Sequence, residues 1–186
     1  MKLGRTLARV AIGGLFAGHG VQKLFGWLDG PGLDGTEKTM DSLEMRPAKA
    51  NAMLAGSAEA GGGALFAAGV APPLTGAALI ATMITAIRKV HLAKGPWNTN
   101  GGYEFNVALI AAILAVIGDT RRSALALALG AAGSTIAIEA GRRWSEEAGD
   151  EADFAAPERA EAEARGGRFR EEQAVEAAVE APIGSA

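Results

Sequence analysis

Residues 55–65 read AGSAEAGGGAL and decide the fold, because they set one carboxylate among small and apolar residues. They lie inside an apolar segment, residues 50–70, that has the length of a membrane span, about 20 residues. If this segment enters from outside, Glu59 lies ~13 Å along the helix axis, near the middle of the bilayer. A charged side chain there costs ~2.5–3.5 kcal/mol unless it pairs or reaches water, and the neighbouring glycines let a second helix approach closely. The stretch therefore predicts a helical membrane protein with a paired or functional acid in its interior.

Three further segments have the composition of membrane spans. They cover residues 7–28, 74–94 and 103–117, and the last is slightly short for a hydrocarbon core of ~30 Å. Pro72 and Pro73 predict a tight turn before the third span. Together with residues 50–70, these segments predict an all-α membrane protein built on a four-transmembrane-helix bundle.

A fifth apolar run, residues 124–138, ends at Glu139. It is short for a span, so we treat residues 121–144 as an additional apolar helix and a candidate fifth C-terminal span. Residues 145–186 are rich in Glu, Ala and Arg and cannot bury a core, which predicts a disordered acidic low-complexity tail. The expected domains are therefore the four-helix membrane domain over residues 1–120, the additional helix, and this tail.

The composition excludes several kinds of chemistry. The chain has no cysteine, so it cannot supply a disulfide, a thiolate nucleophile or iron–sulfur ligands. With two histidines, one copy cannot build a multi-histidine metal centre, and we expect no metal site. The glycines at residues 61–63 follow no strand and lack the Lys-Ser/Thr of a phosphate-binding loop.

The distribution of basic residues predicts the orientation in the membrane. Lys2, Arg5 and Arg9 precede the first span and hold the N-terminus in the cytoplasm. The loop over residues 29–49 then lies outside; it is more acidic than basic, and residues 36–43 predict a short interfacial helix. We expect a multi-pass protein of the cell (inner) membrane with a cytoplasmic N-terminus.

Polar side chains on all four spans fall at similar depths. His19 and Lys23 share one face of the first span, and Arg88 and His91 share one face of the third. Long lysines can snorkel to the interface, but Glu59 is too short to do so from mid-depth. We expect one interior polar network in the outer half of the bundle, formed by His19, Lys23, Glu59, Arg88, His91, Glu104 and Asn106.

Within this network the residue types suggest different roles. Glu59, His19 and His91 are the candidate catalytic residues, because carboxylates and imidazoles exchange protons. The depth and sign of the candidates leave four partners for Glu59: His19, Lys23, Arg88 and His91. The candidates for substrate binding are Lys23, Arg88, Glu104, Asn106 and Trp97. Trp97 also fits an aromatic belt at the membrane interface.

Four short motifs in this part of the chain resemble one known family. They are HGVQKLFGW at residues 19–27, EAGGGAL at 59–65, IRKVHLAKGPW at 87–97 and YEFN at 103–106, and their order and spacing resemble those of the DoxX family. The resemblance implies a four-helix membrane fold. It also implies a link to oxidoreductases, since some relatives are subunits of a thiosulfate–quinone oxidoreductase. Others associate with a superoxide dismutase and a sulfurtransferase in an oxidative-stress complex.

Three functions are consistent with the sequence. The first is a membrane subunit of a quinone-linked or oxidative-stress-related oxidoreductase system, with quinone as cofactor, none bound covalently, and electrons supplied by soluble or membrane partner subunits. The second is a small-solute or proton pathway, since intramembrane acids and histidines also form relays. The third is a non-catalytic scaffold. Whether the chain is itself an enzyme is left open; the expected partners include membrane lipid but no nucleic acid.

Overall fold

The computed structural model describes residues 2–147, and these residues form helices joined by short connections, with no strand. The all-α class predicted from the sequence is confirmed for this part of the chain. The predicted tail lies outside the described residues from residue 148 onward. The helices are α1 (Lys2–Phe25), α2 (Gly32–Ser42), α3 (Ala48–Ala68), α4 (Pro72–Ala86), α5 (Glu104–Ile117) and a last helix, Thr120–Glu147, called here the C-terminal helix.

The helices α2, α4 and the C-terminal helix extend beyond the predicted segments. The predicted interfacial helix is present as α2, but it begins earlier, directly after Pro31. The helix α4 continues through a π-helical turn, η1 (Ile87–His91), and a 3-10 turn, η2 (Leu92–Lys94), to give 23 helical residues. The apolar run 124–138 lies within a single helix of 28 residues. Past the run, Arg142 and Arg143 pair with Glu139 at i,i+3 and i,i+4 spacing, and such pairs favour a helix.

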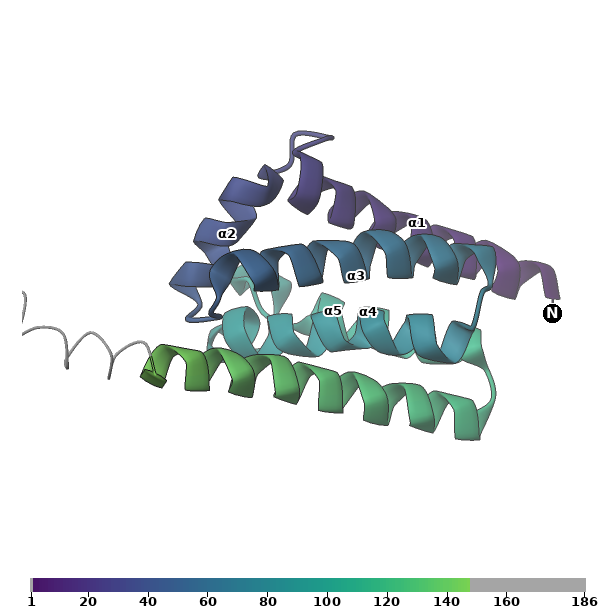
Figure 1. Cartoon of the computed structure of the whole chain (residues 1–186). Helices are drawn as coiled ribbons and strands as arrows, with labels where there is room; N and C mark the ends of the chain where they lie inside the picture. Colours follow the sequence, from purple (N-terminus) through teal and green to yellow (C-terminus); the bar gives the residue numbers. More distant parts are fainter. Residues whose placement is uncertain (1, 148–186) are drawn as a thin grey trace, which may run out of the picture. The chain divides into compact units, whose positions relative to one another are not determined.

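The helix α3 lies at the centre of the bundle and packs against α1, α2 and α4. Figure 1 shows α3 and α4 between α1 and the C-terminal helix, with α2 across one end. The C-terminal helix lies along α4, where Gly130 packs against Ile80, and reaches the α2 end, where Gly141 packs against Met45 and Arg46. In the described residues the bundle therefore has four long helices and the shorter α5, and α2 covers one end.

Glycines allow α1 and α3 to pack closely. A Cβ added at Gly13 would lie 2.5 Å from the carbonyl oxygen of Gly63, and one at Gly63 would lie 2.6 Å from the nitrogen of Ala17. At Gly20 a Cβ would collide with the backbone of Ala60. Because the two backbones touch, side chains near this contact are brought together whatever their polarity.

Two arginines place three helix ends on the same side of the bundle. Arg9 Nε donates to the carbonyl oxygen of Ala67, 3.2 Å away, near the C-terminus of α3. The guanidinium of Arg5 lies beside Gly118, which ends α5. A cation near a helix C-terminus is favourable because it interacts with the exposed carbonyl groups and the helix dipole. The N-terminus of α1 and the C-termini of α3 and α5 therefore share one end, as an up-and-down bundle requires.

The surface of the bundle indicates a membrane protein. The helices Pro72–Lys94 and Thr120–Glu147 are long and apolar enough to cross a membrane, and only 22% of each apolar window is buried. The apolar core helix of a soluble protein would instead be buried on most sides. The helices α1 and α3 are long enough but contain charged residues and many glycines, and α5 has 14 residues, about 21 Å of helix. An apolar surface that covers most of two long helices is typical of a protein surrounded by lipid.

Because α1 and α3 pack closely on one face of α1, a glycine-to-alanine substitution on α1 should affect stability differently at different positions. We expect Gly20→Ala to lower the melting temperature in detergent, because the added Cβ collides with Ala60 and overpacking costs ~1–3 kcal/mol. Gly14→Ala is the matched control, since nothing lies within 4 Å of its Cβ position and alanine favours helix. A Gly20→Ala protein that melts as high as Gly14→Ala would contradict the packing.

Candidate functional site

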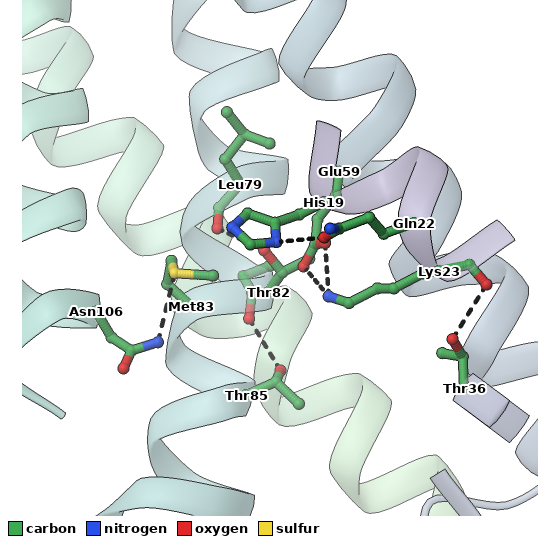
Figure 2. A network of polar contacts seen from close by, with 11 residues as sticks. His19, Gln22, Lys23, Thr36, Glu59, Leu79, Thr82, Met83, Thr85 and Asn106 are labelled. Carbon is green, nitrogen blue, oxygen red and sulfur yellow. Dashed lines mark hydrogen bonds and ion pairs between the residues drawn. The ribbon is translucent and has the colours of Figure 1, made fainter. Parts of the chain in front are cut away.

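An ion pair between α1 and α3 lies at the centre of the site. Lys23 Nζ is 2.5 Å from each carboxylate oxygen of Glu59, so the ammonium group donates to both oxygens (Figure 2). The Glu59 residue is 2% exposed, whereas the Lys23 side chain is 31% exposed. Of the four partners that depth and sign allowed for Glu59, the structure selects Lys23.

The local sequence explains how Lys23 reaches Glu59. Gly56 lies one helical turn before Glu59, and its Cβ position would be 3.5 Å from Lys23 Cβ and 2.7 Å from Leu24. Without a side chain at position 56, the stem of Lys23 lies along the surface of α3 and its ammonium group arrives beside the carboxylate. The contact of Gly20 with Ala60 holds the two helices at this separation.

The two members of the pair differ in their access to water. The carboxylate of Glu59 is enclosed and relies on Lys23 for compensation, because an unpaired buried charge is strongly unfavourable. The ammonium group lies on a flexible stem that is one-third exposed, so it retains a route to solvent or to a ligand. The pair as a whole is close to neutral, which makes it compatible with a low-dielectric interior.

The helix α2 is attached to the backbone beside this pair. Thr36 is 3% exposed, and its hydroxyl lies 3.0 Å from the carbonyl oxygen of Lys23 and 2.7 Å from that of Gly32. The hydroxyl can donate to one of these oxygens at a time. This contact fixes α2 over the end of α1 and makes α2 one wall of a cavity.

A cavity of about 550 Å³ adjoins the ion pair. Its walls come from α2, α3, α4 with η1, and the C-terminal helix, together with Lys23 of α1, and most of their surface is apolar. The volume lies within the ~300–1,000 Å³ usual for small-molecule sites, which are mostly apolar with a few polar groups. Lys23 and Glu59 line this cavity, so the ion pair faces it.

Other polar groups line the cavity away from the ion pair. Thr85 Oγ1 on α4 lies 2.9 Å from Ser134 Oγ on the C-terminal helix, and Ser134 is 1% exposed. Lys89 Nζ donates to the carbonyl oxygen of Leu43, 3.0 Å away, and so ties η1 to the end of α2. These residues were not among the candidates predicted from the sequence. Ser134 in the apolar run 124–138, and Thr82 and Thr85 at i,i+3 spacing, were the available signals.

The two histidines have separate partners. His19 Nδ1 lies 3.1 Å from the side-chain oxygen of Gln22, and His19 is exposed on α1. His91 Nδ1 lies 2.6 Å from the carbonyl oxygen of Gly101, which ties η1 to the loop before α5. No group of three or more His, Asp or Glu side chains within residues 2–147 is placed to hold a metal ion.

The remaining predicted residues also bond elsewhere. Arg88 donates to Thr135 Oγ1 at 3.2 Å, and Glu104 accepts from the backbone nitrogen of Asn98 at 2.8 Å. Asn106 is 9% exposed and its amide lies 3.4 Å from the sulfur of Met83, as Figure 2 shows, while Trp97 is 64% exposed. Among the predicted network members within residues 2–147, only Lys23 and Glu59 are joined directly by a hydrogen bond or ion pair. The predicted single network is therefore an ion pair with separate polar contacts around it.

These features define a class: a helical membrane protein whose interior holds an ion pair beside an apolar-walled cavity. The sequence model of the DoxX family matches residues 4–92, which supports a DoxX-family protein. The match includes both members of the ion pair and ends before α5 and the C-terminal helix. No curated protein and no solved structure matches the chain.

The ion pair predicts an asymmetric response to the removal of its two members. We expect Lys23→Met to destabilise the bundle more than Glu59→Gln, because it leaves an enclosed carboxylate alone, whereas a lone Lys23 can reach water. Lys23→Met should lower the free energy of unfolding by roughly 2–3 kcal/mol. This is less than the ~3–5 kcal/mol lost when one member of a fully buried pair is removed. Thermal melting in detergent measures the single variants and the double variant, which should recover part of the loss.

Two comparisons serve as controls for this cycle. Lys38→Met removes an exposed lysine from α2 and should be nearly silent. Cycles of Glu59→Gln with neutral variants of His19, Arg88 or His91 should be additive, because these residues have other partners. An additive Lys23–Glu59 cycle would show that the pair makes no net contribution.

Proposed function

We propose that the chain is an integral membrane subunit of an oxidoreductase system and that its cavity binds a quinone. The observation that carries the proposal is the Lys23–Glu59 pair facing an apolar-walled cavity of about 550 Å³. A quinone has a polar ring that accepts hydrogen bonds and an apolar tail, so it needs both kinds of surface. The frequent association of DoxX proteins with oxidoreductases supports the same function.

The residues of the site fit this ligand. A bound quinone supplies reversible uptake of two electrons and two protons. Lys23 is placed to donate a hydrogen bond to a carbonyl oxygen, and its partly exposed stem gives the ammonium group room to turn from Glu59 toward the cavity. Glu59 is placed to hold a proton that passes between Lys23 and the ligand. The chain has no cysteine, so we assign the supply of electrons to a partner subunit.

We further propose that α1, α3, α4, α5 and the C-terminal helix cross the cell inner membrane. The end that carries Arg5 and Arg9 lies in the cytoplasm, as the positive-inside rule requires, and α2 lies outside. The C-terminal helix starts with Arg121 and Arg122 at the cytoplasmic end and extends to the α2 end (Figure 1). At that outer end Glu139 pairs with the two arginines of the last turns, which lowers their effective positive charge.

Quinone content tests the proposed function. We expect the protein purified in mild detergent to contain quinone, detected by mass spectrometry of its lipid extract. Lys23→Met should weaken binding of an added short-tail quinone about tenfold or more, because a hydrogen bond from a charged donor contributes ~1.5–3 kcal/mol. Ala55→Leu, which fills the cavity from α3, should have a similar effect, and Ala64→Leu on an exposed position of α3 should not.

Loss of binding is interpreted only for variants that still melt cooperatively. If the wild-type protein binds no quinone but conducts protons or a small solute in liposomes, the site is a pathway. If it does neither, the scaffold function is favoured.

Single cysteines test the orientation, since the natural chain has none to interfere. We expect Lys38→Cys on α2 to be labelled in intact cells by a membrane-impermeant thiol reagent. Val70→Cys, in the connection between α3 and α4, should be labelled only after the membrane is opened. Both positions are exposed, so accessibility within the fold does not differ between them. The reverse labelling pattern would invert the topology.

A further inference from the structure

The C-terminal helix contributes directly to the cavity although it lies outside the segment that matches the DoxX family. The family match ends at residue 92, whereas Gly133, Ser134 and Ala137 line the cavity. In this chain the C-terminal helix, which lies outside residues 4–92, therefore supplies part of the cavity wall. Any ligand in the cavity touches residues of both parts.

Ser134 is the polar group on this wall, and its hydroxyl hydrogen is available to a ligand. Thr85 Oγ1 lies 2.9 Å from Ser134 Oγ and also 2.9 Å from the carbonyl oxygen of Ala81. When Thr85 donates to Ala81, Ser134 donates to Thr85. When Thr85 donates to Ser134, the Ser134 hydrogen has no other acceptor among the contacts of residues 2–147. Rotation of the two hydroxyl groups thus converts an arrangement in which both hydrogens are bonded within the protein into one in which the Ser134 hydrogen is free.

A carbonyl oxygen in the cavity would favour the second arrangement. The surrounding wall is apolar, so a hydrogen without an acceptor there is unfavourable and a ligand acceptor is correspondingly favourable. Water could also accept this hydrogen, but a mainly apolar wall offers it few other partners. Ser134 is therefore suited to a ligand with a hydrogen-bond acceptor and no charge.

Two polar contacts among those that line the cavity belong to different pairs of helices. Lys23 and Glu59 belong to α1 and α3, whereas Thr85 and Ser134 belong to α4 and the C-terminal helix. Figure 2 shows Thr85 set apart from the Lys23–Glu59 pair. Both donors line the same cavity, with apolar side chains around them. A ligand that uses both needs two acceptors at separate positions on one compact apolar body.

We propose that the cavity recognises the two opposite carbonyl oxygens of a 1,4-quinone, one through Lys23 and the other through Ser134, which Thr85 positions. The proposal rests on the proposed function and goes further, because it names the second contact and assigns the selection of a para-dione ring to the C-terminal helix. A lysine alone would accept any ligand with one carbonyl group.

Two probes separate the two contacts. One is a short-tail 1,4-benzoquinone, and the other is a cyclohexenone with the same tail, which has one carbonyl group. We expect Ser134→Ala in the full chain to weaken the quinone about 3- to 10-fold, the range of one neutral hydrogen bond, and to leave the cyclohexenone unchanged. Lys23→Met should weaken both probes.

Thr135→Ala is the matched control. Thr135 is the next residue on the same helix, is exposed, bonds to Arg88 and does not line the cavity, so its loss should change neither probe. The ratio of the two affinities within one variant is insensitive to partial loss of folded protein. It therefore separates ligand recognition from a purely structural Thr85–Ser134 contact.

Each outcome of this experiment decides a different point. A Ser134→Ala protein with the quinone affinity of Thr135→Ala overturns the second contact while leaving the quinone site in place. An equal loss for both probes assigns Ser134 to helix packing and also overturns it. A wild-type protein that binds neither probe refutes the proposed function itself.

Discussion

The buried carboxylate of Glu59 is the constraint on which the arrangement of the bundle depends. A carboxylate enclosed in a helical membrane protein requires a counter-charge, because the desolvation of a lone ion exceeds what local packing can return. Lys23 supplies that charge only because α1 and α3 touch through Gly20, Gly56 and Gly63. The glycines and the ion pair are therefore two parts of one feature. The glycines bring the backbones together, and the ion pair makes that separation compatible with a charged interior.

The cavity is a consequence of how the other helices surround this pair. The helix α2 is held over the end of α1 by Thr36, and Lys89 ties η1 to the end of α2. The C-terminal helix closes the side opposite α3 through small residues that pack on α4. Elements from distant parts of the sequence thus line a mainly apolar space that contains the Lys23–Glu59 pair, Lys89 and several hydroxyl groups. The proposed ligand, with a polar ring and an apolar tail, suits such a space better than an ion, which would lose its hydration there.

Residues outside the ion pair connect the site to the frame of the bundle. His91 holds η1 to the loop before α5, Arg88 reaches the C-terminal helix, and Asn106 contacts Met83 in the wall of the cavity. Their positions make them supports of the cavity rather than members of one chain of hydrogen bonds. A π-helical turn in this region is notable because such turns occur often at functional sites. Within this turn Lys89 lines the cavity and His91 contacts the adjacent loop.

The sequence by itself determined the helical class, the position of the long helices and the need of Glu59 for a partner, because these follow from hydropathy, length and the cost of burying charge. It left four partners for Glu59, since sign and depth along separate helices say nothing about rotation about the helix axes. Only the tertiary structure selected Lys23, because the contact between Gly20 and Ala60 and the bare surface at Gly56 fix how α1 and α3 face each other. The same reason explains why Ser134 and Thr85 were not predicted. A hydroxyl in an apolar run is unremarkable until the packing of the C-terminal helix on α4 places it at the wall of a cavity.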